Sequence, residues 1–124
     1  MEKWLYLIIG GSVGTVSRYV MAGVITQRVG TAFPWGTVAV NLTGCFVIGF
    51  LDVLFEKKFM LNTNMRIVLM TGFCGAFTTF STLILETSDL LKNNQFLHAF
   101  GNVMVSFIVG FTAFKLGAVL ARFI

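Results

Sequence analysis

Residues 71–82 read T-G-F-C-G-A-F-T-T-F-S-T, and they lie in the middle of a segment that is otherwise apolar enough to cross a bilayer. Two glycines followed by two threonines make a weak helix. A break at membrane depth is tolerated only where it is buried in protein or lines a cavity. We therefore expect the helix to be interrupted here; the alternative is that Gly72 and Gly75 only permit close packing and the helix runs through.

An interruption of this kind would expose backbone groups that bind ions. Free carbonyl oxygens bind cations, and free amide hydrogens favour anions. Phe73, Phe77 and Phe80 follow helical spacing within the same stretch, and they are either ordinary packing residues or part of a site. Because ring edges carry partial positive charge, rings beside hydroxyls can hold a small anion without a fixed cation that would trap it.

The rest of the chain has the composition of a membrane protein. Its 124 residues are 56% hydrophobic and 11% charged, against about 25% charged in soluble domains. We predict an all-α integral membrane protein, with one domain covering residues 1–124 and four transmembrane helices, because four apolar segments can each span about 30 Å of hydrocarbon. These segments are Trp4–Ile25, Trp35–Phe55, Met65–Leu91 and Phe96–Phe123.

Several function classes are disfavoured. The net charge is +4, but the basic residues are scattered, which argues against nucleic acid as a partner. His98 is the only histidine, so a histidine metal site or a conventional triad has too few parts. Cys45 and Cys74 lie in apolar segments without CxxC spacing, and we interpret both as packing residues. We predict that the protein is not an enzyme.

Charge at the helix ends predicts the orientation. Lys/Arg are enriched in cytoplasmic loops. The side with both termini has five such residues and the other side has two, Arg28 and Lys92, so we expect cytoplasmic termini. The five are Lys3, Lys57, Lys58, Arg66 and Arg122.

Polar residues inside the predicted spans are functional candidates, because burying them in hydrocarbon is costly. Arg18 would either snorkel to the interface or give positive potential to an anion path. Asn41 would bond either a neighbouring helix or a solute. Glu86 would either carry a proton or hydrogen-bond within the protein. We also expect two polar stripes that can face each other across a narrow path: Thr37 with Asn41, and Asn102 with Ser106 and Gly110.

Glycines in the first segment point to close helix contacts. Gly10 and Gly14 form a small-xxx-small pair, which lets two helix backbones approach. The contact would be either inside one subunit or between two.

Three motifs together resemble one family, the small fluoride channels called Fluc or CrcB. They are G-G-S-V-G-T-V-S-R-Y at 10–19, P-W-G-T-V-A-V-N-L-T-G at 34–44, and the stretch at 71–82. The resemblance covers nearly the whole chain. It implies a fluoride-selective channel in the cell membrane, built as an antiparallel, dual-topology dimer with two pores at its interface.

The resemblance also implies roles for individual residues. The family's third helix breaks at the dimer centre, where backbone carbonyls matching Gly75 and Thr78 hold a structural sodium ion. Arg18 and Glu86 match further family positions. The pore residues implied are Asn41, Phe80, Ser81, Thr82 and Ser106.

At one position the chain departs from the family. A second phenylalanine usually follows the first by three residues, and here that position is Leu83. Leucine has no polarised ring edge. Together with the Lys/Arg bias, Leu83 favours pairing with an oppositely oriented paralogue that supplies one good pore; a homodimer is the other possible assembly.

Two other classes remain. A small multidrug-type, proton-coupled transporter also has four helices, but it needs an intramembrane carboxylate, usually in helix 1, where this chain has Arg18. Glu86 is the one residue that keeps this class open. A structural factor without transport would leave Asn41 and the hydroxyls of 78–82 unexplained.

Overall fold

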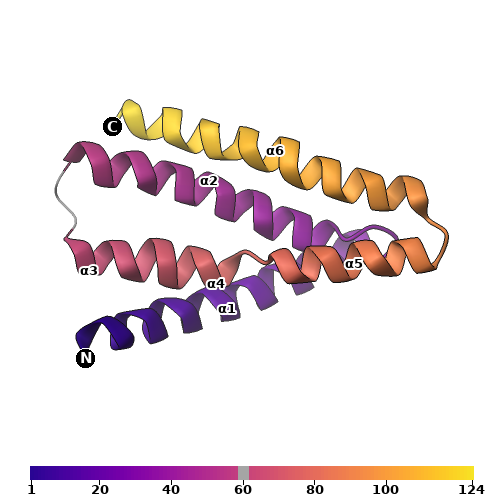
Figure 1. The fold of residues 1–124 in the computed structure, drawn as a ribbon, viewed down its shortest axis with the longest axis horizontal. Coiled ribbons are helices and arrows are strands. Elements are labelled where there is room, and N and C mark those ends of the chain that lie inside the picture. Colours follow the sequence, from indigo (N-terminus) through magenta and orange to yellow (C-terminus); the bar gives the residue numbers. More distant parts are fainter. Residues whose placement is uncertain (59–61) are drawn as a thin grey trace.

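The fold was analysed in a computed structural model, which describes residues 1–58 and 62–124. The described residues form four helical rods long and apolar enough to cross a membrane, and Figure 1 shows that the third is interrupted. The prediction of an all-α chain with four membrane-length helices, the third broken, is confirmed. The side chain of Lys58 and residues 59–61, part of the basic connection used to predict orientation, lie outside the described residues. The elements are α1 (Glu2–Val29), α2 (Trp35–Lys58), α3 (Thr63–Arg66), η1 (Ile67–Cys74), α4 (Gly75–Phe77), α5 (Phe80–Lys92) and α6 (Phe96–Arg122).

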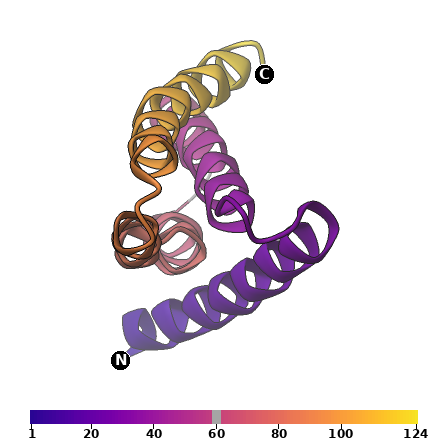
Figure 2. The ribbon, with the colours of Figure 1, turned by 90° about the vertical axis from the view of Figure 1, so that its right-hand side faces the viewer.

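The helices pack as two pairs. α6 lies along α2, and α1 lies against η1 and α4. Figure 2, which looks along the bundle, shows α1 crossing beneath the third rod while α2 and α6 stay together. Both termini lie at the same end of the bundle, and the α1–α2 and α5–α6 connections lie at the other end (Figure 1). This arrangement brings the interruption in the third rod between α1 and α2.

Glycine allows the helix backbones to touch. A Cβ atom at Gly49 would overlap the backbone carbonyl of Phe114, and one at Gly117 would overlap that of Phe46. On α1, Gly10 and Gly14 lie against backbone carbonyls of η1 in the same way. The Gly10/Gly14 pair therefore makes its close contact inside one subunit, which decides between the two interpretations.

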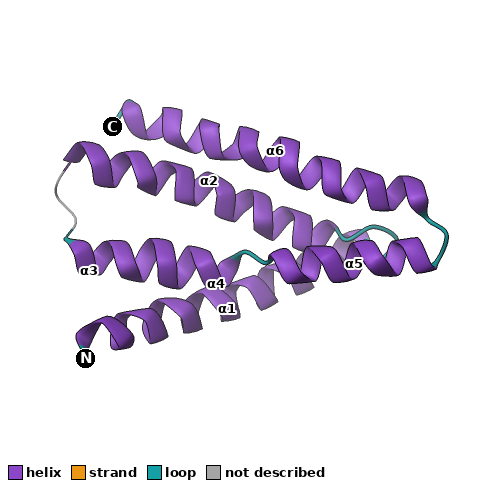
Figure 3. Ribbon diagram, viewed as in Figure 1, coloured by secondary structure: helices purple, strands orange, loops and turns teal. Residues whose placement is uncertain are grey.

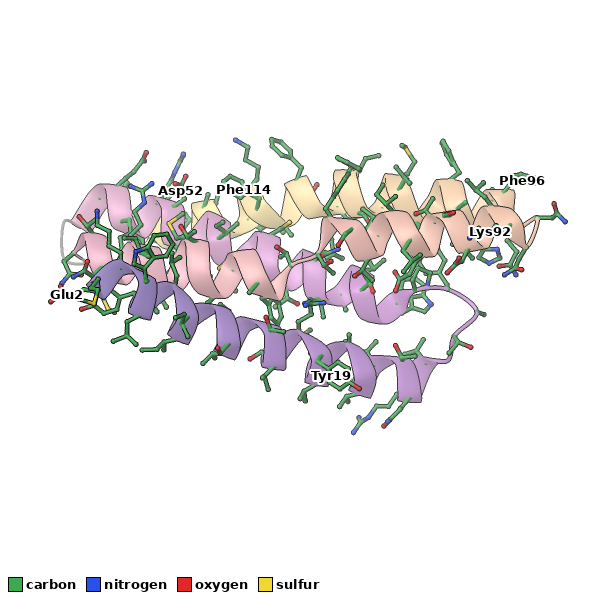
Figure 4. All side chains as sticks on the ribbon, turned by 60° about the horizontal axis from the view of Figure 1, so that its bottom comes forward. Glu2, Tyr19, Asp52, Lys92, Phe96 and Phe114 are labelled. Atoms are coloured by element: carbon green, nitrogen blue, oxygen red, sulfur yellow. The ribbon has the colours of Figure 1, made fainter. Side chains whose placement is uncertain are left out.

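The outer surface of the bundle is apolar. Tyr19 on α1 and Phe96 at the start of α6, both labelled in Figure 4, are 83% and 63% exposed. By contrast, Cys74 is 1% exposed and neither cysteine is in a disulfide, as expected for packing residues. The exposed apolar outer surface of the bundle fits lipid or a second subunit as its neighbour.

Candidate functional site

The interruption in the third rod consists of two extended residues. α4 ends at Phe77, and Thr78 (φ −86°, ψ 157°) and Thr79 (φ −147°, ψ 115°) follow in extended conformation before α5 begins. Figure 3 shows the break as a short loop between helices. Thr78 caps the preceding turn, because its Oγ1 donates to the Cys74 carbonyl over 2.9 Å. The predicted break is confirmed, and the continuous helix is excluded.

The segment before the break is a π-helix, which sequence reasoning missed. η1 runs from Ile67 to Cys74, and the Gly75 amide that follows donates to the Met70 carbonyl, five residues back. Such segments are often found at functional sites. Apart from its glycines, the sequence carries no signal for this pattern, because it depends on how the backbone packs against α1.

Asn41 of α2 pairs with the backbone of the break. Its Oδ1 accepts from the Thr79 amide over 2.8 Å, and its Nδ2 donates to the Thr79 carbonyl over 3.1 Å. Both backbone groups of Thr79 are thereby satisfied by one side chain. This supports the interpretation that Asn41 bonds a neighbouring segment, and no bond of its second amide N–H is found among the described residues.

Arg18 of α1 contacts the other side of the break. Its Nε donates to the Ala76 carbonyl over 3.1 Å. Neither of the two roles expected for Arg18, the interface anchor or the positive potential, included this bond.

The start of α5 carries a group of hydroxyls. Thr79 caps the helix, since its Oγ1 accepts from the Thr82 amide over 3.2 Å. The same hydroxyl donates to Thr82 Oγ1 over 3.0 Å and lies 3.4 Å from Ser81 Oγ. Because a helix N-terminus carries partial positive charge, these hydroxyls lie where an anion is favoured.

Two cavities meet at the break. The first, which we call the break groove, has a volume of about 560 Å³ and lies between α2, the break and α6; it is lined by Asn41, Thr78, Thr79, Phe80, Leu83 and Ser106 among others. The second, the α1 cavity, has a volume of about 480 Å³, and its lining includes Arg18, Thr37, Thr79, Thr82 and Glu86. Thr79 lines both. Ser81 is exposed and is not among the lining residues of either cavity.

The α1 cavity continues toward the end of the bundle. A third cavity of about 410 Å³ shares Thr26 and Glu86 with it and is lined beyond them by the α1–α2 and α5–α6 connections. Glu86 stands at the junction: its Oε1 accepts from Thr37 Oγ1 over 2.7 Å, and its Oε2 is buried without a partner among the described residues. An interhelix hydrogen bond, one of the two roles expected for Glu86, is thus present.

The expectation that two polar stripes face each other is only partly right. Thr37 faces Glu86, and Asn102, which is 0% exposed, donates to Thr87 Oγ1 over 3.0 Å. Asn41 and Ser106 do line the same groove, together with Gly110. The difference arises because α5 packs beside the α2–α6 pair, and its residues Glu86 and Thr87 take the hydrogen bonds of Thr37 and Asn102.

Aromatic rings line the groove in a different pattern from the one expected. Phe73 and Phe77 stack with centroids 5.4 Å apart, but Phe80 follows the break and is 64% exposed at the groove. Leu83 is only 4% exposed, so it lies in the groove's floor. Sequence reasoning missed the α6 rings in this lining, although their spacing of four and three residues was a signal: Phe107, Phe111 and Phe114.

At the break, the groups that could bind a hard cation are backbone carbonyl oxygens. Among the described residues there is no group of three or more His, Cys, Asp or Glu side chains that could hold a metal ion. Gly75 opens the three-residue helix α4 and Thr78 follows its end in the break, so no regular helix continues far enough to pair their carbonyls. Backbone oxygens of this kind fit an alkali cation.

Comparison with known proteins places the chain in a family. Residues 5–118 match the family described as CrcB-like protein, Camphor Resistance (CrcB). A protein named "Fluoride-specific ion channel FluC" in Desulforapulum autotrophicum is 40% identical over 123 residues, covering 99% of this chain and 98% of its own length. Proteins of the same name in Solidesulfovibrio magneticus (40% identical, 100% and 99% covered) and Nitrosococcus oceani (34% identical, 96% and 98% covered) are also similar.

Replacing Asn41 by leucine is expected to destabilise the fold by about 2 kcal/mol or more, because it leaves two backbone groups of Thr79 unpaired at membrane depth. The measurement is reversible unfolding of the purified chain in mixed detergent micelles. Thr43→Val is the matched control on the same helix, since the Thr43 hydroxyl bonds only Ala39 of its own helix. Equal stability of the two variants would contradict the bracing role of Asn41.

Proposed function

The chain belongs to the CrcB family, and from this premise we propose that it is a fluoride-selective ion channel that lets fluoride leave the cytoplasm passively. One observation carries the proposal at the level of this chain: Thr79 lines two cavities, one between α2 and α6 and one beside α1. The fluoride path runs along the α1 cavity, past the break and into the break groove.

Hydroxyls and amides would replace the water around the ion. Thr37, Thr79 and Thr82 line the α1 cavity, and Arg18 adds positive potential there. In the groove, the free N–H of Asn41, the Ser106 hydroxyl and the ring edge of Phe80 are the available donors. Ser81 adds a hydroxyl at the exposed start of α5. Conduction needs several weak contacts rather than one strong one, so that the ion can leave.

A second subunit would complete the pore. The groove is open on the side of exposed rings, since Phe80, Phe107 and Phe111 are 64%, 59% and 64% exposed. An antiparallel partner covering these rings would enclose the path, with two pores in the dimer. Leu83 lies in the groove's floor and not on this rim. Leucine in place of the family's phenylalanine therefore leaves the rim that a partner would cover unchanged. This favours the homodimer over a paralogous partner.

A structural sodium ion at the dimer centre is part of the proposal. The backbone carbonyls of Gly75 and Thr78 would hold it together with the same groups of the second subunit. A bound sodium ion would give these carbonyl oxygens a partner that lipid cannot supply. The chain's own contribution is to free these carbonyls by ending α4 at Phe77.

The proposed location is the cell membrane, which the chain crosses as one four-helix domain. The main alternative, a proton-coupled multidrug transporter, needs a carboxylate inside the membrane, usually in its first helix. In α1 the acidic residue is Glu2, which lies in the first turn at the bundle's end, so this alternative is disfavoured. Glu86 is the remaining candidate proton carrier, and one of its oxygens is taken by Thr37.

Liposomes that contain only this purified chain test the channel function. We expect rapid fluoride efflux at a fluoride electrode, no chloride efflux, and loss of flux in Asn41→Asp and Phe80→Ile. Rapid efflux from liposomes that contain this chain alone would also establish the homodimer. An intact chain without efflux, even when an oppositely oriented paralogue is added, would contradict the proposal; efflux only with that paralogue would support the heterodimer.

Sodium dependence of the assembly tests the cation site. Replacing sodium by N-methylglucamine is expected to weaken dimerisation, because the carbonyls of Gly75 and Thr78 then face one another without an ion. The measurement is the monomer–dimer equilibrium of the chain in lipid bilayers, followed by single-molecule photobleaching. A dimer fraction that does not depend on the cation would contradict the site.

A further inference from the structure

Ending a helix inside a membrane leaves particular backbone groups to be paired by other segments. In an unbroken helix the Ala76 carbonyl would accept from the Phe80 amide, and the Thr79 amide would donate to the Gly75 carbonyl. Because Thr78 and Thr79 are extended, neither pair forms. Asn41 replaces the partner on the α5 side, as described above, and the Ala76 carbonyl on the α4 side is bonded by Arg18.

Arg18 is the last of three contacts that α1 makes with carbonyls of the third rod. Gly10, Gly14 and Arg18 are each four residues apart and therefore share one face of α1. Gly10 lies against the Val68 carbonyl and Gly14 against the Phe73 carbonyl, both so closely that a Cβ atom would overlap them. Arg18 then reaches the Ala76 carbonyl.

The spacing of these contacts links α1 to the π-helix. Val68 and Phe73 are five residues apart, the span of one π-helical hydrogen bond, whereas the facing glycines are four residues apart, the span of one α-helical hydrogen bond. One turn of α1 thus matches one turn of η1. The glycine face of α1 contacts η1 at both carbonyls, and Arg18 contacts α4, which follows η1.

We propose that Arg18 is a positioning residue that holds the helix break in place, so that Thr79 stays between the two cavities. A role through charge alone would need only a cation near the path. The positioning role needs the directed Nε–H of a planar guanidinium, which lysine lacks although it keeps the charge. The part of this inference that concerns flux rests on the proposed fluoride channel; the part that concerns the break does not.

The test combines hydrogen exchange with flux on the full chain in lipid nanodiscs and liposomes. Arg18→Lys and Arg18→Gln are both expected to speed amide exchange in peptides covering residues 76–82 by at least about 10-fold, as loss of a charge-assisted hydrogen bond implies, and to slow fluoride efflux by a similar factor. Arg28→Gln is the matched control, because Arg28 is exposed in the last turn of the same helix. It is expected to match the wild type in both measurements.

Two results would overturn the proposal. In the first, Arg18→Lys has the exchange and flux of the wild type, and the defect of Arg18→Gln becomes smaller at high salt. This combination would show that the charge of residue 18 matters and not its directed hydrogen bond. The other is unchanged exchange in both variants, whatever their flux. A wild-type chain that conducts no fluoride would remove the channel proposal, but the exchange data would still decide the role of Arg18.

A second pair of variants covers the case that the Arg18 variants do not fold. Gly14→Ala pushes α1 away from the Phe73 carbonyl one turn before Arg18, so it is expected to speed exchange in residues 76–82 while Arg18 is intact. Gly11→Ala is its control, because a Cβ atom there meets nothing within 4 Å. Equal exchange in these two variants would also overturn the proposal.

Discussion

The structure depends on one requirement: backbone groups freed by a helix break in hydrocarbon must find partners inside the protein. At Thr78–Thr79 these partners come from two other helices, Asn41 of α2 and Arg18 of α1. Because both are side chains on rigid helices, the break is a fixed feature of the bundle and not a loose end. The close contacts of Gly10 and Gly14 bring α1 near the third rod, where Arg18 reaches the Ala76 carbonyl.

The same break also creates a helix start inside the bundle, where negative charge is favoured. A helix that starts at membrane depth presents amides and a capping hydroxyl where a continuous helix would present only side chains. Thr79 and Thr82 supply the hydroxyls, and Thr79 lines both the break groove and the α1 cavity. No strong cation stands in the groove among its lining residues, which suits an ion that must also leave.

Much of this was predictable from the sequence, because it follows from local composition. Apolar length indicated the four helices, and the glycine- and hydroxyl-rich stretch at 71–82 indicated the break. The partners of the polar residues were not predictable: Thr37 bonds Glu86 and Asn102 bonds Thr87, and these pairings depend on how α5 packs beside α2 and α6. The π-helix and the bond from Arg18 to Ala76 likewise depend on backbone packing that side-chain patterns do not encode.

The proposed fluoride path passes Thr79 between the break groove and the α1 cavity. Silver accessibility of a Thr79→Cys variant, in a chain whose two cysteines are replaced by alanine, tests this claim most directly. We expect silver ions, added to either side of the liposomes, to reach the new thiol and stop fluoride flux irreversibly. Flux that persists with silver on both sides would contradict it.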